Sequence, residues 1–138
     1  MSLFNIFDIS GTAMSAQSLR MNLTASNIAN ADSVAGDEKS AYKARQPVFS
    51  TILEEMGQSE AAGGVRMLAV VESKASHNRR YEPGNPLAND EGYVYDSNVN
   101  IIEEMTNMIS ASRSYQNNVE VINTSKDMLL KTLKLGNG

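Results

Sequence analysis

The sequence predicts a mainly α protein with a small β-containing insert, in which long N- and C-terminal helices pair as a coiled-coil-like layer beside an irregular middle domain. Apolar residues recur at helical spacing at both ends of the chain, whereas the middle is polar and carries all three prolines. The 138 residues include 6% aromatic residues and no Trp, so Met, Leu, Ile, Val and Ala must build the core, as they do between helices. We therefore expect an N-terminal axial helix within residues 1–31, a loop plus small β-containing outer domain in 32–97, and a C-terminal axial helix within 98–138.

The N-terminal segment is apolar on two sides. One helical row contains Phe7, Met14, Met21, Ala25 and Ile28, and a second contains Ile9, Ala13, Ala16, Leu19 and Leu23. A helix of this kind is normally enclosed on several sides. Asn27 and Asn30 are poor helix formers placed among these residues, so we expect their amides to bond backbone groups at the helix end or across a subunit boundary and to set register there.

The middle of the chain changes character several times. Residues 31–47 are polar and predict a loop, residues 48–56 predict a short helix or strand, and residues 57–64 resemble a linker. A strand is expected at 65–71. Residues 81–100 contain Pro83, Gly84, Pro86 and Gly92 and predict a turn region with a strand at 93–95.

The C-terminal segment has the clearest periodicity. Asn100 is a plausible N-cap with Glu103 three residues later, and Gly136 lies where the helix should stop. A helix over 101–135 would be about 52 Å long, whereas a compact chain of this size is about 37 Å across, so it must extend beyond its own domain. Its apolar stripe follows alternating steps of four and three: Ile101, Met105, Met108, Ser112, Tyr115, Val119, Ile122, Lys126, Leu129 and Leu133. A second row beside it contains Ile102, Ile109, Met128, Leu130 and Leu135.

Charge and cysteine content exclude several classes of protein. The net charge of −4 argues against nucleic-acid binding. The whole deficit lies in residues 31–96, which hold eleven acids against seven bases. The absence of Cys excludes a disulfide framework, a thiolate metal site and a Cys nucleophile. The N-terminus has no signal-peptide pattern, and no stretch is long and apolar enough for direct membrane insertion.

No residue pattern predicts catalysis, a cofactor site or a metal site, and we expect that the protein is not an enzyme. His77 is the single histidine and is expected to be solvated at the surface. The acidic doublets Glu54–Glu55, Asp90–Glu91 and Glu103–Glu104 are expected on solvated faces or at helix starts, since adjacent helical residues point in different directions. Arg79 and Arg80 are expected in salt bridges or at an interface. Two readings of the apolar stripes remain open, a helical hairpin that completes a monomer core and packing between subunits.

Nearly the whole chain resembles the axial proteins of the bacterial flagellum, which form its rod, hook and hook-associated parts. The wider family is marked by NIAN at 27–30, and the N-terminal match extends over NIFDISGTAMSAQ at 5–17 and ASNIANADSV at 25–34. Resemblance to proximal rod proteins is carried by YEPGNPLANDEGYV at 81–94, NVNIIEEM at 98–105, SASRSYQNNVEVIN at 110–123 and KDMLLKTLKLG at 126–136. The loop at 32–41 is longer than is usual in the wider family and fits the proximal rod pattern, whereas residues 57–80 match weakly.

This resemblance implies a structural subunit of the proximal rod in the flagellar basal body, a tubular drive shaft that transmits torque across the periplasm. It implies synthesis in the cytoplasm, export without a cleaved signal peptide through the flagellar type III export apparatus, and contact with other copies of itself, other rod proteins and the rod-base adaptor. A cytosolic coiled-coil adaptor or chaperone is the alternative. The expected assembly interface comprises Met14, Leu19, Met21, Leu23, Asn27, Ile28, Asn30, Ile101, Met105, Met108, Ser112, Tyr115, Val119, Ile122, Leu129 and Leu133. We also expect both terminal segments to be mobile in a dilute monomer and to order on assembly.

Overall fold

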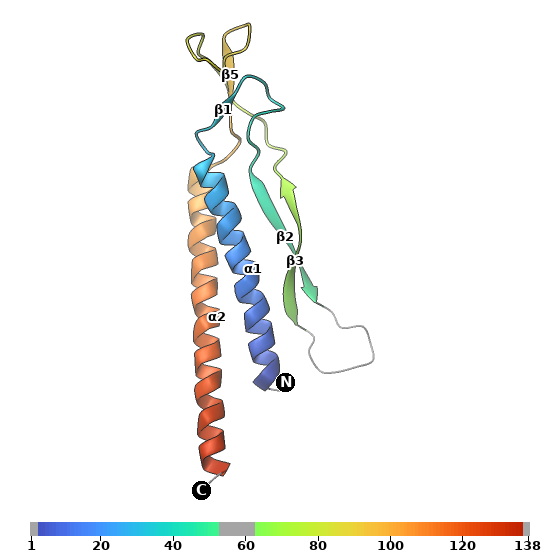
Figure 1. Cartoon of the computed structure of the whole chain (residues 1–138), viewed down its shortest axis with the longest axis vertical. Helices are drawn as coiled ribbons and strands as arrows, with labels where there is room; N and C mark the ends of the chain where they lie inside the picture. Colours follow the sequence, from blue (N-terminus) through green and yellow to red (C-terminus); the bar gives the residue numbers. More distant parts are fainter. Residues whose placement is uncertain (1–2, 53–62, 137–138) are drawn as a thin grey trace.

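The computed structural model of the chain describes residues 3–52 and 63–136. Helix α1 (Leu3–Ala29) and helix α2 (Ile101–Gly136) lie side by side and run in opposite directions (Figure 1). A hairpin of β2 (Arg45–Ile52) and β3 (Gly64–Glu72) packs along α1, and a second small sheet lies beyond the upper end of the helix pair (Figure 1). These elements confirm the prediction of two long terminal helices and a small β-containing middle region.

Both helices agree closely with the prediction. Helix α2 begins directly after Asn100, whose Oδ1 accepts hydrogen bonds from the backbone N–H groups of Ile102 (3.1 Å) and Glu103 (3.3 Å), so the predicted N-cap is confirmed. Among the described residues Glu103 makes no return bond to Asn100, so the second half of the expected capping box is not formed. With 27 residues in α1 and 36 in α2, the C-terminal helix extends past the start of its partner (Figure 1).

The strands lie in two separate sheets. Strands β2 and β3 pair antiparallel from Arg45↔Glu72 to Ile52↔Gly64, with a bulge between Val48 and Phe49. The strand expected at 65–71 is therefore confirmed. Residues 48–52, for which the sequence predicted either a helix or a strand, belong to strand β2. The predictions for 53–62, including Glu54 and Glu55, lie outside the described residues.

The second sheet has the order β1 (Val34–Ala35), β5 (Tyr93–Asp96), β4 (Arg79–Tyr81), with antiparallel pairs. It confirms the strand expected at 93–95. The prediction that 31–47 is entirely loop was wrong at two places, because β1 pairs with β5 and β2 already begins at Arg45. Strand β1 has only two residues and its partner lies about 60 residues away along the chain, so the local sequence gives little signal for it.

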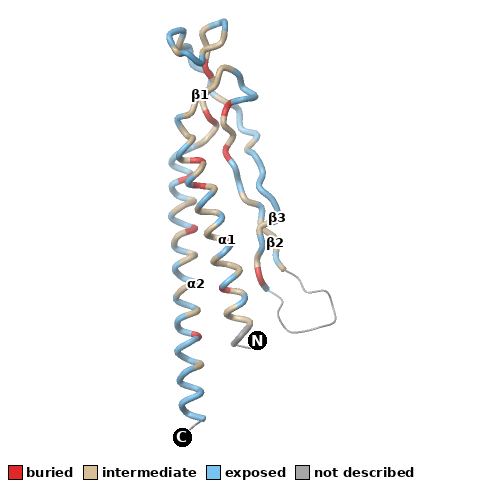
Figure 2. The backbone as a smooth tube through the Cα atoms, in the orientation of Figure 1, coloured by how far each residue is buried: buried red, intermediate tan, exposed pale blue. Residues whose placement is uncertain are grey.

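The buried core is small and made mostly of alanine. The described residues buried as hydrophobic core are Ala16, Ala41, Ala44, Val94 and Ala111. Figure 2 shows that burial concentrates near the junction of helices and strands, whereas the lower part of α2 is largely exposed. Neither helix is apolar enough over a sufficient length to cross a membrane. Most of the large apolar side chains of α2 therefore have no covering element within the described chain.

Candidate assembly surface

The contact between the two helices is made by small and polar residues. On α2 the buried positions are Glu104, Ala111 and Ser125, which are separated by multiples of seven residues. Helix α1 is the only described element whose backbone lies close to α2. Arg20 Nη2 donates across the contact to Asn107 Oδ1 at 3.0 Å. Small side chains along this line allow the two backbones to approach, so the larger apolar side chains are displaced to the flanks.

The predicted apolar stripe lies beside this line of burial. Its members Met108, Ser112, Tyr115, Val119, Ile122 and Leu129 are half-buried. Ile101, Met105 and Leu133 remain exposed by 39%, 51% and 58%. The periodicity of large apolar residues thus identifies the side of α2 that faces α1. It does not identify the buried positions themselves, because the closest contact between the two helices uses small residues.

The remaining apolar residues of α2 are more exposed still. All five members of the second predicted row are exposed, between 46% for Leu130 and 84% for Leu135. Large apolar side chains exposed repeatedly along one helix are candidates for contact with other proteins. Helix α2 therefore offers an apolar face that its own chain does not cover.

The predicted residues of α1 are mostly enclosed by their own chain. Met14, Met21, Leu23, Ile28 and Asn30 are half-buried, and Asn27 is fully buried. Only Leu19 is exposed, at 38%. Helix α1 lies between α2 and the β2–β3 hairpin, which accounts for the two apolar sides seen in its sequence.

Asn27 joins α1 to the first residue of β2. Its Nδ2 donates to the carbonyl of Arg45 at 2.8 Å, and its Oδ1 accepts from the N–H of Arg45 at 2.9 Å. The side-chain amide thus pairs with one residue's backbone as a neighbouring strand would. The Tyr42 hydroxyl also donates to Oδ1, at 3.1 Å. All these partners lie within the same chain, which accounts for an amide in an apolar helix; the expected role in subunit register stays a prediction.

Asn30 ends the same helix. Its Nδ2 donates to the carbonyl of Ser26 at 2.8 Å, and Ser33 Oγ donates to the carbonyl of Asn30 at 2.7 Å. Both carbonyls also accept a backbone N–H at 3.2 Å, that of Ser26 from Asn30 and that of Asn30 from Ser33, so the side chains add a second hydrogen bond to each acceptor. The predicted bonding of Asn30 to backbone at the helix end is confirmed, and its role between subunits remains a prediction.

Asn98 binds the residue next to Arg45, and the sequence analysis did not identify it as important. Its Oδ1 accepts from the N–H of Ala44 at 2.7 Å, and its Nδ2 donates to the carbonyl of Ala75 at 2.9 Å. Two asparagines, one near the end of α1 and one just before the start of α2, therefore hold residues 44 and 45 in place. The available signal was an Asn two positions before the N-cap Asn100, which had no capping role of its own.

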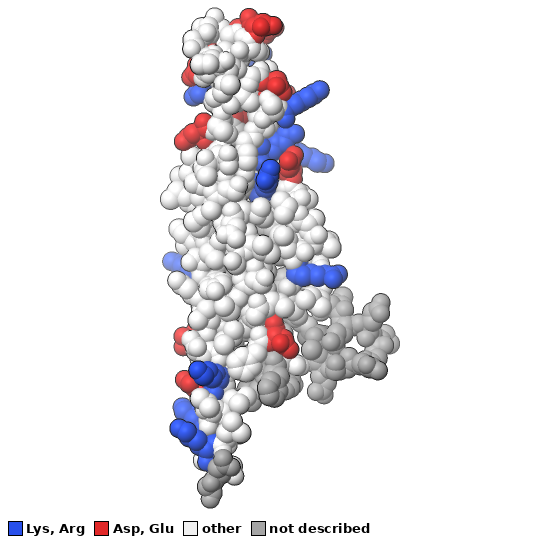
Figure 3. Space-filling view, viewed as in Figure 1, with Lys and Arg blue, Asp and Glu red and all other residues white. Residues whose placement is uncertain are grey.

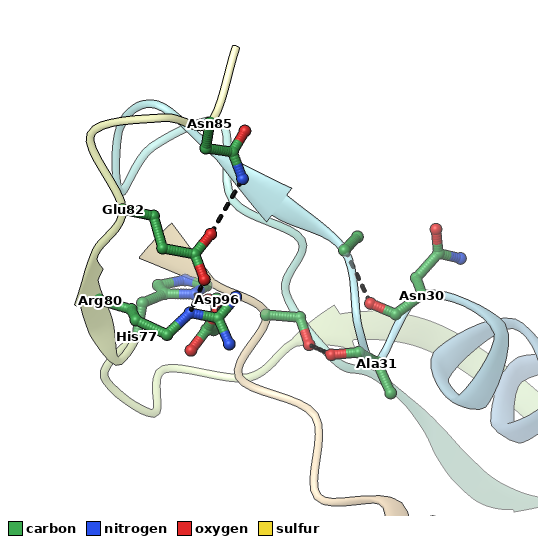
Figure 4. Close-up of polar contacts among 9 residues, drawn as sticks. Asn30, Ala31, His77, Arg80, Glu82, Asn85 and Asp96 are labelled. Carbon is green, nitrogen blue, oxygen red and sulfur yellow. Dashed lines mark hydrogen bonds and ion pairs between the residues drawn. The ribbon is translucent and has the colours of Figure 1, made fainter. Parts of the chain in front are cut away.

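The small upper sheet is tied to the helix junction by polar contacts (Figure 4). Ser97 Oγ donates to the carbonyl of Ala31. Arg80 bridges Glu82 at 3.0 Å and Asp96 at 3.4 Å, which confirms the salt-bridge expectation for this arginine. The predicted solvated state of His77 was wrong: its Nδ1 bonds the carbonyl of Asp96 at 2.8 Å, and its Nε2 is buried without a partner.

Two other chemical expectations have different outcomes. Glu104 was expected on a solvated face or at a helix start; it lies in the first turns of α2 but is only 5% exposed. Arg79 lies over the ring of Tyr93, with its guanidinium carbon 4.6 Å from the ring centroid. Across residues 3–52 and 63–136, no three His, Cys, Asp or Glu side chains group as metal ligands would.

Comparison with known proteins gives one consistent result. The family model described as "Flagella basal body rod protein" matches residues 7–36, and the model described as "Flagellar basal body rod FlgEFG protein C-terminal" matches residues 90–135. The flagellar basal-body rod proteins FlgC of Salmonella typhimurium and Yersinia enterocolitica are each 54% identical over 136 residues, which is 99% of both chains. FlgC of Buchnera aphidicola from Acyrthosiphon pisum is 45% identical over 98% of both chains. The chain therefore belongs to the FlgC family of flagellar basal-body rod proteins.

Proposed function

We propose that this protein is a structural subunit of the proximal rod, and that it assembles with copies of itself and with other rod proteins into the tubular drive shaft. The observation that carries the proposal is the similarity to FlgC rod proteins over 99% of the chain, through both terminal helices. The comparisons give no support to a cytosolic adaptor or chaperone. The relatives' names describe a structural component, which favours a protein that is not an enzyme.

The mechanism is mechanical and depends on burial between subunits. Helix α2 exposes nine large apolar side chains, which would each lose water contact against neighbouring helices. Burial contributes roughly 25 cal/mol per Å² of apolar surface, so contacts repeated along a tube add up to a shaft that resists twisting. We propose that the helices of adjacent subunits then pack in a coiled-coil-like layer, with the hairpin and the upper sheet outside it. Export through the type III apparatus and contact with the rod-base adaptor belong to the same proposal.

The distribution of charge supports an apolar helical layer. On the face shown in Figure 3 the middle of the molecule is nearly free of charge, while charged side chains gather toward the upper end and the C-terminal end of α2. Residues 1–30 hold one acid and one base. Many copies of such a surface can pack side by side without accumulating charge of one sign.

The first experiment deletes the gene in the source bacterium and counts hooks and filaments by electron microscopy, with and without the intact gene restored. Loss of hooks and their return on complementation supports the rod function. Normal flagella in the deletion strain, in the absence of a duplicate gene, would overturn it.

A surface variant then tests the role of the apolar face. Ile109, which is 54% exposed, is replaced by Glu, and Asn117→Glu on an exposed polar position of the same helix serves as the control. Both variants should fold alike because neither side chain is buried. Ile109→Glu should fail to restore hooks and Asn117→Glu should restore them; equal restoration would contradict packing on this face.

A further inference from the structure

A cavity of about 550 Å³ lies between the loop that precedes β2 and the segment that follows β3. A second cavity of about 230 Å³ adjoins it, because the two share residues of both walls. We call the two cavities together the basic pocket. Its charged lining comprises four cations and two carboxylates, namely Lys39, Lys43, Arg45, Lys74, Glu38 and Glu72.

Positive charge gathers in this pocket although the surrounding segment is acidic. Of the seven bases in residues 31–96, four line the pocket, beside two of the eleven acids. On the face shown in Figure 3, Lys and Arg side chains gather beside the upper end of the β2–β3 hairpin. Both ion pairs among the described residues involve Arg80, so none of the four pocket cations has a carboxylate partner there. The pocket therefore holds positive charge that the described chain does not pair.

Hydrogen bonds fix the loop that forms one wall. Asp37 Oδ1 accepts from the backbone N–H groups of Lys39 and Ser40, both at 2.9 Å, and the Ser40 hydroxyl donates to Asp37 Oδ2 at 2.7 Å. Ala41, on the same loop, is buried. The backbone that carries the two loop lysines is therefore ordered before a partner arrives, which lowers the entropy cost of binding.

Asn98 connects this loop to the other wall. Its Nδ2 donates to the carbonyls of Ser73 at 3.4 Å and Ala75 at 2.9 Å, and its Oδ1 accepts from the N–H of Ala44 at 2.7 Å. The N–H of Ser73 also donates to the carbonyl of Ala44, at 2.7 Å. The separation of the two walls is therefore set by the fold.

His77 lies in the second wall and lacks one hydrogen bond. Its Nδ1 donates to the carbonyl of Asp96 at 2.8 Å, because a carbonyl can only accept. In the neutral ring Nε2 is then an acceptor, and it is buried without a donor among the described residues. An unmatched buried acceptor costs free energy, so a donor that reaches Nε2 from the pocket is stabilising. Lys74 and Ser76 in the same wall are exposed, and their side chains can move aside to admit one.

We propose that the basic pocket receives an acidic segment of a neighbouring protein subunit. Its carboxylates face the ammonium groups of Lys39, Lys43 and Lys74, and a backbone N–H of the same segment donates to His77 Nε2. A peptide meets both requirements, because its side chains supply the charge and its backbone supplies the donor, whereas a carboxylate alone supplies no donor. This inference rests on the proposed rod function and names a contact outside the two long helices.

Titration of the full-length protein with a hexaglutamate peptide, followed by NMR, tests the chemistry of the pocket. The peptide should move the amide signals of residues 38–45 and 72–77 and the Nε2 signal of His77, and added salt should weaken the binding. A hexaglutamine peptide should not bind. Signals that move only elsewhere would overturn the proposal, and so would binding of inorganic phosphate as tight as that of hexaglutamate.

Variants of the lysines locate the binding. Lys39→Gln, Lys43→Gln and Lys74→Gln combined should raise the Kd for hexaglutamate about tenfold or more, because each partly exposed ion pair contributes roughly a factor of two to five. The melting temperature should not change, since none of the three side chains forms a hydrogen bond or ion pair with a described residue. Arg66→Gln removes an exposed charge from β3 outside the pocket and is the matched control. Equal Kd values for the triple variant and the control would contradict the site.

The partner segment is identified in assembled basal bodies. A photo-cross-linking amino acid replaces Ser76 in the gene that restores the deletion strain, and mass spectrometry maps the segment to which it links. Lys39→Glu with Lys74→Glu should restore hooks to about a tenth of the parent level or less. Replacement of the acidic residues in the mapped segment by Lys should bring the hooks back. A cross-link to no protein, or charge reversal without rescue, would overturn the proposal.

The two proposals fail in different ways. If the deletion strain has normal flagella, the rod function itself is wrong. If the intact gene is required for hooks but the charge-reversed gene restores them fully, only the contact at the basic pocket is wrong.

Discussion

Replacement of Asn27 by Ala removes the amide that joins α1 to β2. Three hydrogen bonds are lost, two to the backbone of Arg45 and one from Tyr42. At about 0.5 to 1.5 kcal/mol for each neutral hydrogen bond, the free energy of unfolding should fall by about 2 to 4 kcal/mol. For a chain of this size, a change of about 3 kcal/mol corresponds to a melting temperature lower by about 10 °C.

Asn22→Ala is the matched control, because Asn22 is exposed on the same helix and forms no described side-chain bond. Both substitutions gain the same helix propensity, so the difference between them isolates the contribution of the three bonds. Urea unfolding followed by circular dichroism at the helix band measures both. A difference below about 0.5 kcal/mol would refute the role assigned to Asn27, since it is smaller than the net contribution of a typical single hydrogen bond.

Asn27→Asp sharpens the same test. The substitution keeps an oxygen for the Arg45 N–H but replaces the Nδ2 donor with an oxygen that faces the Arg45 carbonyl. Burial and this carbonyl raise the pKa of the introduced carboxyl in the folded state above its unfolded value near roughly 4. Stability is therefore greatest below the unfolded pKa, where the protonated group donates, and is lost as pH rises through the folded pKa. A variant whose stability relative to the parent does not depend on pH would contradict this geometry.

Three further predictions concern other parts of the chain. Gly92 has φ +80°, and a Cβ at this position would lie 2.9 Å from a ring carbon of Tyr81 and 3.2 Å from the Cβ of Pro83, so Gly92→Ala should lower the free energy of unfolding by about 2 kcal/mol, as measured by urea titration; an unchanged free energy would contradict this crowding. The Ser40 hydroxyl and backbone N–H lower the pKa of Asp37, so Ser40→Ala should raise that pKa toward its ordinary value in a carboxyl NMR titration, and an unchanged pKa would exclude the hydroxyl as the main cause. The stability that this carboxylate contributes is present above its unfolded pKa and is lost as pH falls through its folded pKa. Amide exchange in a dilute monomer should be fastest in the last two turns of α2 and slower where α1 packs on it, whereas uniform protection along α2 would contradict the absence of a covering element.

The sequence by itself determined both helices and two of the five described strands, β3 and β5, while it left β2 as either helix or strand and gave no sign of β1 and β4. Periodicity, an Asn N-cap and a terminal Gly are local signals, and they located α2 to within a residue of its observed ends. The strand at 65–71 followed from a run of apolar and β-branched residues, and family motifs spread over the chain indicated a flagellar rod protein. These features depend on neighbours in sequence, so no knowledge of the three-dimensional packing was needed.

Only the tertiary structure decided which residues meet. The seam of α2 uses Ala111 and Ser125, which carry no hydrophobic signal, because close approach of two backbones selects small side chains. The pairing of Asn27 with Arg45 spans 18 residues, and that of Asn98 with Ala44 spans 54. Glu103 and Glu104 are equivalent helix-start charges in the sequence, but the fold buries Glu104 and leaves Glu103 exposed. The periodicity of a sequence indicates which face of a helix is apolar. Whether a residue on that helix is buried depends on which other elements of the chain pack against it.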